Sequence, residues 1–147
     1  MTTSDLEPRL RQDLTDARKA RDKARTLLLS TTLAEVKNAE IAGGSPLDDE
    51  SVIQVLTRAV KRRRDACEQM RAAGREELAS REEWEAETLG EYLPEALTEA
   101  EVRQQIRTLV ADGASSMGDI MSRLMPTLKG RFDGKQASRM VREELEV

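Results

Sequence analysis

Histidine is absent from the 147-residue sequence, and the chain contains one cysteine and three aromatic residues. Without histidine, the chain lacks the side chain that titrates near neutral pH and the commonest ligand of transition metals, so we expect no metal site. The one cysteine, Cys67, cannot form an internal disulfide, and nothing in the sequence requires an oxidising compartment. The aromatic residues are Trp84, Tyr92 and Phe132, so the core must consist mainly of Leu, Ala, Val and Met.

Long apolar runs are also missing. The longest purely aliphatic run covers residues 27–29, far short of the roughly 20 residues that span a bilayer. The first residues, Met-Thr-Thr-Ser-Asp, lack the basic and apolar regions of a signal peptide. The sequence therefore predicts a soluble, cytoplasmic protein that has no membrane partner.

A regular pattern of helix signals is present instead. Apolar residues recur at spacings of three and four, and no alternating pattern typical of strands occurs. Residues with capping side chains precede the apolar segments and predict the starts of helices: Ser4 (with Glu7), Asp22, Asp48, Thr98 (with Glu101), Ser116 and Asp133 (with Gln136). Glycines predict the ends of helices: Gly43, Gly44, Gly74, Gly113 and Gly130.

The lengths of these segments divide the chain in two. Two long helices, of about 25 and 17 residues, are joined by Gly74 and predict an antiparallel hairpin. After Pro94 the apolar segments become shorter, and three of them follow. We therefore expect an all-α fold, with an N-terminal long-helix hairpin domain over residues 1–93 and a small C-terminal three-helix domain over residues 94–147.

Charge is distributed unevenly along the predicted hairpin. Residues 58–75 hold seven basic residues against two acidic ones, and residues 76–101 hold ten Glu against Arg81. These stretches are the two arms of the hairpin, so we expect them to attract each other. Arg63 lies on the apolar face of its helix, and its charged end should reach solvent or pair with a glutamate of the other arm. The four basic residues at 61–64 spread around the helix and cannot form one nucleic-acid surface.

A second basic stretch, residues 129–142, is the candidate RNA-binding site. It carries a balance of +4, with Asp133 as its one acidic residue. Like charges at helical spacing repel each other by about 0.2–0.5 kcal/mol per pair, and a polyanion would reverse that sign. The alternative interpretation is an exposed basic face without a partner. The candidate residues are Lys129, Arg131, Lys135, Arg139 and Arg142, of which the last three lie opposite the apolar face of one helix.

No segment has the pattern of an active site. The glutamates within residues 82–87 have no histidine to complete a di-metal site, so we interpret them as a solvated face. Ser115 and Ser116 lack a neighbouring base, and residues 113–118 lack the Gly-Lys-Ser/Thr ending of a phosphate loop. Cys67 lies on an apolar stripe and is expected in the core. We therefore predict no catalytic residue, no metal site and no cofactor.

Short motifs follow one another over essentially the whole chain: Lys37-Asn38-Ala39-Glu40-Ile41, Ala73-Gly74-Arg75-Glu76, Tyr92-Leu93-Pro94, Gly113-Ala114-Ser115-Ser116-Met117, Met125-Pro126, Lys129-Gly130-Arg131 and Asp133-Gly134-Lys135. Together they resemble the YqeY-like (GatB/YqeY) family. The resemblance implies an all-helical protein with an N-terminal long-helix domain and a small helical domain. It also implies kinship with the C-terminal tail of the B subunit of the tRNA-dependent amidotransferase, a tail that contacts tRNA.

The resemblance bears on chemistry as well. In the amidotransferase, ATP-dependent chemistry belongs to a separate cradle domain, which has no counterpart in these 147 residues. A family label of carbon–nitrogen ligase with glutamine as amido donor therefore describes a reaction that we do not expect of this chain alone. The resemblance carries the tRNA-contacting role over to Lys129-Gly130-Arg131 and Gly134-Lys135, where the motifs coincide with the second basic stretch.

Two functional hypotheses follow, from different classes. The first is a non-catalytic accessory protein that binds tRNA, or another folded RNA, through phosphate contacts of the C-terminal domain. Folded RNA is favoured over single strands because the chain has few aromatic rings for base stacking. The alternative is a protein-interaction module that docks to an amidotransferase or another cytoplasmic assembly. A third interpretation, an enzyme acting on its own, has no motif to support it.

Overall fold

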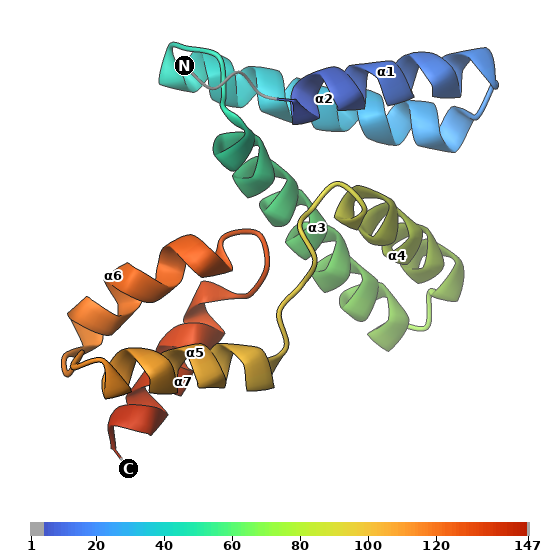
Figure 1. The fold of residues 1–147 in the computed structure, drawn as a ribbon. Coiled ribbons are helices and arrows are strands. Elements are labelled where there is room, and N and C mark those ends of the chain that lie inside the picture. Colours follow the sequence, from blue (N-terminus) through green and yellow to red (C-terminus); the bar gives the residue numbers. More distant parts are fainter. Residues whose placement is uncertain (1–4, 147) are drawn as a thin grey trace. The chain divides into compact units, whose positions relative to one another are not determined.

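A computed structural model describes residues 5–146, and within this range the chain forms seven α-helices and no strand (Figure 1). The predicted all-α fold is confirmed. No helix among the described residues is long and apolar enough to cross a membrane. The helices are α1 (Leu6–Lys19), α2 (Lys23–Gly43), α3 (Asp49–Ala72), α4 (Glu76–Gly90), α5 (Glu99–Ala111), α6 (Met117–Leu128) and α7 (Gly134–Leu145).

Five of the helices, α2, α3, α5, α6 and α7, begin where the capping residues predict. Thr98 forms the expected capping box with Glu101. Four other side chains accept a hydrogen bond from the backbone N–H three residues further on, at 2.9–3.3 Å: Asp22, Asp48, Ser116 and Asp133. The capping box predicted at Ser4 lies outside the described residues. At the start of α1, the carboxylate of Asp49 accepts from the N–H groups of Asp5 and Leu6 at 2.7 and 3.0 Å.

The chain divides into two compact units, one up to Leu93 (unit 1) and one from Pro94 onward (unit 2). In unit 1, α3 and α4 run antiparallel side by side, and Gly74 supplies the left-handed φ of 75° that the turn between them requires (Figure 1). A second hairpin, formed by α1 and α2, packs against α3. The core of unit 1 is aliphatic and includes side chains without exposed surface: Leu10, Leu29, Val36, Leu56 and Leu89.

Unit 2 is a small bundle in which α5, α6 and α7 each pack against the other two. Its core includes side chains without exposed surface: Val102, Ile106, Ile120, Leu128 and Val141. Phe132 packs against this core, so the one aromatic ring of unit 2 is part of its interior contacts. The N–H of Leu97 donates to the carbonyl of Arg131 at 2.8 Å and joins the segment that enters unit 2 to the loop between α6 and α7.

The oppositely charged arms of the α3–α4 hairpin attract each other, as predicted. Arg63 donates from Nε to Glu85 at 3.2 Å and from Nη1 to the carbonyl of Ala59 at 3.0 Å. Its side chain is 12% exposed, so Arg63 pairs with the other arm and does not extend into solvent. Arg71 donates to Glu83 of α4 at 3.1 Å.

Candidate nucleic-acid interface

Three of the five predicted RNA-binding residues lie together on α7. One side of this helix is buried in the core of unit 2 through Ala137 and Met140. The opposite side carries the α7 basic face, defined here as Lys135, Arg139 and Arg142, all of them exposed. Arg139 lies 3.9 Å from Glu143, at the outer limit of an ion pair. The three side chains therefore form one open cationic surface.

The other two predicted residues belong to the α6–α7 loop, residues 129–133. Lys129 is exposed, whereas Arg131 is half-buried. Arg131 donates from Nε to the carbonyl of Glu95 at 3.0 Å, and its own carbonyl accepts from Leu97. Arg131 therefore anchors the segment that enters unit 2, and this role in folding is separate from the RNA contact predicted for it.

The N-terminus of α7 is already occupied by a side chain. The Oδ2 of Asp133 accepts from the N–H of Gln136 at 3.3 Å. Its carboxylate lies where a phosphate would otherwise meet the first amides of the helix. An anion at this end of α7 must be bound by side chains, and Lys135 is the basic residue in the first turn.

The acidic residues near the end of α7 pair with α5. Glu144 accepts from Arg103 at 3.0 Å and from Arg107 at 3.4 Å. The bond from Arg103 is the main cause that lowers the pKa of Glu144 below its ordinary value of 4.5. Glu143 accepts from Arg103 at 3.4 Å. These glutamates are balanced by arginines of α5, so the α7 basic face keeps its positive charge.

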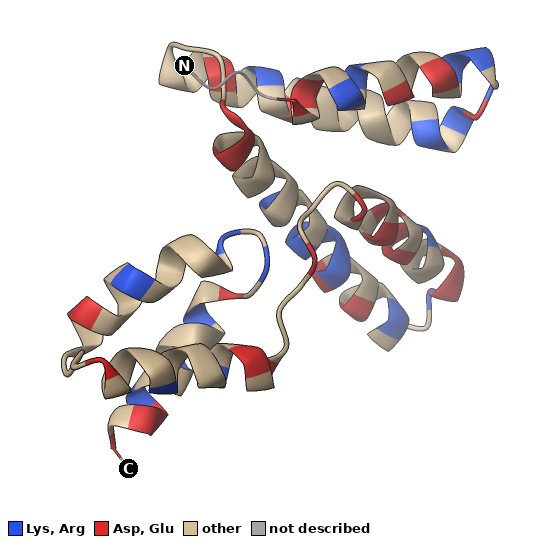
Figure 2. Ribbon diagram, viewed as in Figure 1, with Lys and Arg blue, Asp and Glu red and all other residues tan. Residues whose placement is uncertain are grey.

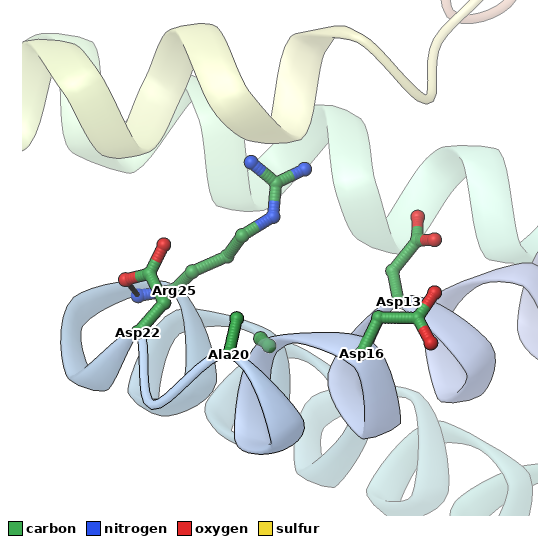
Figure 3. A pocket seen from close by; sticks show the side chains of 6 residues that line it. Asp13, Asp16, Ala20, Asp22 and Arg25 are labelled. Carbon is green, nitrogen blue, oxygen red and sulfur yellow. Dashed lines mark hydrogen bonds between the residues drawn. The ribbon is translucent and has the colours of Figure 1, made fainter.

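A cavity of about 280 Å³ lies beside the turn between α1 and α2 (Figure 3). Figure 3 shows Asp13 and Arg25 directed toward the same side of this hairpin. The hydroxyl of Tyr92 donates to Asp13, and burial together with this bond raises the pKa of Tyr92 to about 12. Asp16 accepts from Gln12 at 3.0 Å, and Asp22 caps α2. The three carboxylates of the cavity are therefore engaged in holding the fold.

Carboxylates on α4 are engaged in the same way. Glu83 and Glu85, which belong to the predicted solvated face, accept from Arg71 and Arg63 of α3. Over residues 5–146, no three His, Cys, Asp or Glu side chains are grouped so that they could hold a metal ion. Cys67 is buried, as predicted.

Comparison with known proteins identifies the family. Residues 7–145 match the family that is described as "Yqey-like protein". The chain is a member of this family. A protein of Pyrenophora tritici-repentis, named Altered inheritance of mitochondria protein 41, mitochondrial, is 27% identical over 142 residues, which are 92% of this chain and 78% of that protein.

Two further relatives cover less of the Yqey-like chain. An uncharacterized protein of Schizosaccharomyces pombe is 36% identical over 90 residues, which are 61% of this chain and 73% of the relative. A Glutamyl-tRNA(Gln) amidotransferase subunit of Thermococcus gammatolerans is 40% identical over 58 residues. This match covers 40% of the chain but only 9% of the amidotransferase subunit, so the likeness concerns a small part of that protein.

Several motif residues of this Yqey-like protein have structural roles. Gly74 and Gly113 adopt positive φ after α3 and α5. Tyr92 is buried and donates to Asp13 of α1, and the guanidinium of Arg9 lies 4.6 Å from the centre of its ring. The positive φ explains why glycine occupies positions 74 and 113, and the contacts with α1 explain why tyrosine occupies position 92.

A second group of basic residues was missed by the sequence reasoning. It is the tip cluster, defined here as Arg18, Lys19, Arg21 and Lys23, at the turn where α1 meets α2. A charge count over residues 16–25, with five basic residues against two acidic ones, could have found it. Helix caps and apolar spacing predict only the cap at Asp22 in this stretch and give no signal for the basic residues around it.

Proposed function

We propose that this Yqey-like protein is a non-catalytic accessory that binds folded tRNA through the basic residues of unit 2. The α7 basic face is the observation that carries the proposal. Its side chains are exposed, it lies above a packed core, and the glutamates that follow it on α7 are bonded to α5. Exposed cations neutralise nucleic-acid phosphates, and the acidic neighbour recorded for the α7 basic face is Glu143, 3.9 Å from Arg139.

The chemistry of the surface favours folded RNA over single strands. Asp133 caps α7 by accepting from the N–H of Gln136, so recognition falls to long, flexible Lys and Arg side chains, which position phosphates without reading bases. Phe132 is partly buried against the core, and unit 2 has no second aromatic residue on which bases could stack. Recognition by backbone shape fits both features.

The comparison with the amidotransferase relative supports this choice of RNA. The name of that relative refers to glutamyl-tRNA(Gln), and the chain is similar to a small part of it. We therefore also propose an amidotransferase as a protein that this chain assists. We propose the cytoplasm as its location. Several relatives carry the word mitochondrial in their names, so localisation of a tagged full-length chain in its own cells is the measurement that decides.

The test is a titration of folded tRNA with the full chain at several salt concentrations, read by fluorescence anisotropy. The triple variant Lys135→Gln, Arg139→Gln and Arg142→Gln removes three phosphate contacts. Three contacts contribute about 2.7 to the slope of log affinity against log salt, or about 40-fold between 50 and 200 mM. We expect the slope of the variant to be smaller by this amount.

The matched control changes three exposed basic residues of α3: Arg58→Gln, Lys61→Gln and Arg64→Gln. The control variant has the same net charge as the α7 variant, so a general effect of charge alters both equally. The proposal requires the control to keep the wild-type slope. Equal slopes for the two variants, or no tRNA binding by the wild type at low salt, contradict it.

A protein partner is the second candidate, favoured by one observation. Leu27 and Ile41 are 56% and 70% exposed, and they lie fourteen residues apart, on the same side of α2. Exposed aliphatic side chains at this spacing suit docking of another helix. Nuclease-treated capture of an amidotransferase subunit, lost on changing both residues to Gln, would support this function instead.

A further inference from the structure

The tip cluster sits on a well-defined turn. The N–H of Asp22 donates to the carbonyl of Ala17 at 3.0 Å, and the N–H of Arg21 donates to Arg18 at 3.1 Å. Arg21 is the one non-glycine residue with a positive φ, 57°, among the described residues. A hydrogen-bonded turn and two helix ends therefore gather four basic residues within a stretch of six.

These four side chains have no partner within the described chain. All of them are exposed, and none forms an ion pair or a side-chain hydrogen bond with residues 5–146. Two acidic residues lie nearby, but Asp16 accepts from Gln12 and Asp22 accepts from the N–H of Arg25. Figure 2 shows basic residues on both sides of the turn that joins α1 to α2. The tip cluster is thus an unbalanced positive surface.

Helix stability explains only half of the cluster. Arg18 and Lys19 lie in the last turn of α1, where a cation offsets the negative end of the helix dipole. Lys23 opens α2, where a cation is unfavourable, and α2 has no acidic residue in its first turn. Among the seven helices, α7 alone shares this lack, and it carries the α7 basic face. Asp22 and Asp133 already cap these two helices with a carboxylate, so an external anion would pair with the basic side chains rather than with the helix amides.

We propose that the tip cluster is a second phosphate-binding surface for RNA, an inference that rests on the proposed function. Exposed Lys and Arg side chains match phosphates by charge, as on the α7 basic face. The ring of Tyr92, which contacts α1 of this hairpin, is buried, and the tip cluster itself holds no aromatic residue, so we expect contacts to the RNA backbone here as well. Leu27 is the one large exposed apolar side chain of the first half of α2, too little for insertion into a bilayer, so RNA is favoured over a lipid surface.

The experiment uses the full chain and the same tRNA titration. The tip variant is Arg18→Gln, Lys19→Gln and Lys23→Gln; Arg21 stays unchanged, because its positive φ makes substitution there a test of the backbone as well. Loss of three contacts lowers the salt slope by about 2.7, and affinity at low salt falls accordingly. The α3 control variant, which has the same net charge, is expected to bind as the wild type does.

A second measurement locates the RNA without relying on affinity. A photoreactive benzophenone amino acid at Ala20, which is exposed within the turn, should cross-link to bound tRNA, whereas the same group at exposed Ala72 should not. Far-UV circular dichroism of each variant checks that the helices are retained.

The outcomes separate this inference from the proposed function. If the α7 variant loses tRNA while the tip variant matches the control and Ala20 does not cross-link, the tip inference is wrong and the proposed function stands. If only the tip variant loses tRNA, the tip inference holds and the α7 site is wrong. No tRNA binding by the wild type contradicts both. Loss of binding to vesicles with 30% phosphatidylserine by the tip variant, with tRNA binding unchanged, would assign the tip to a lipid surface and overturn the inference.

Discussion

Two stretches of the chain are almost equally basic but have different surroundings. Residues 58–75 carry a balance of +5 and residues 129–142 a balance of +4. In the first stretch, Arg62, Arg63 and Arg71 pair with glutamates of α2 or α4. In the second, Glu144 pairs with arginines of α5, and the three exposed cations of the α7 basic face have one recorded acidic neighbour among residues 5–146, Glu143 at 3.9 Å from Arg139. The net charge of a stretch therefore indicates a binding surface less well than the ion pairs that its basic residues form.

The largest effect that separates the two stretches should be on stability. Arg63→Met removes the bonds to Glu85 and Ala59 and is expected to lower the free energy of unfolding by about 2 kcal/mol, the value of hydrogen bonds to charged groups. Arg139→Met, on the exposed α7 basic face, should change it by no more than about 0.5 kcal/mol. Urea unfolding measures both, and Trp84 fluorescence reports on the hairpin that contains Arg63. Equal losses of unfolding free energy in the two variants would contradict the difference between the two basic stretches.

A smaller effect on stability is expected at Tyr92. Its phenol hydroxyl, rather than an arginine, donates the hydrogen bond to Asp13. Tyr92→Phe deletes this hydrogen bond and should cost about 1 kcal/mol at neutral pH. The folded-state pKa of Tyr92 is raised to about 12 from an ordinary value of 10.0. Its contribution is therefore complete below pH 10 and is lost as the pH rises from 10 to 12.

The control for this prediction is the variant itself, since Tyr92→Phe has no phenol to titrate. Thermal unfolding of the wild type and the variant, measured from neutral pH to pH 12, should show that the difference between them shrinks above pH 10. A difference that stays constant over this range would show that the hydroxyl contributes nothing specific.

The smallest effect is expected at Glu144. Its folded-state pKa is lowered, so its contribution to stability is present above the ordinary value of 4.5 and is lost as the pH falls through the lowered value. With Glu144→Gln, the free energy of unfolding of unit 2 should therefore fall less steeply as the pH is lowered. Glu146→Gln, which changes an exposed residue near the end of the same helix, is the matched control and should leave that pH dependence as it is. Identical acid profiles for the two variants would contradict the prediction.

Much of the fold was predictable because its signals are local. A cap such as Asp48 bonds to an amide three residues away, and a glycine such as Gly74 ends a helix by its own backbone conformation. The pairing of Arg63 with Glu85 was one of two predicted outcomes, since the charged end of an arginine on an apolar stripe either reaches solvent or pairs with an acidic residue. The α7 basic face follows from the spacing of its residues along one helix. Its role in RNA binding stays a prediction.

What the sequence could not predict depends on contacts between distant segments. Asp49 caps α1 across more than forty positions, and Tyr92 reaches Asp13 across 79. The same reason applies to Arg131, which the sequence assigns to a binding surface and which the fold also uses to hold Glu95. No spacing rule links such residues, because the approach of the helices decides which of them meet.

The anchoring role of Arg131 has a mechanical consequence. Its side chain and its backbone carbonyl hold the chain at Glu95 and Leu97, on the segment by which the chain enters unit 2. Lys129 lies two positions earlier on the same loop. A molecule that pulls on this loop therefore pulls on the entrance of the unit as well, so that load applied at the surface is transmitted to the start of the bundle through two hydrogen bonds.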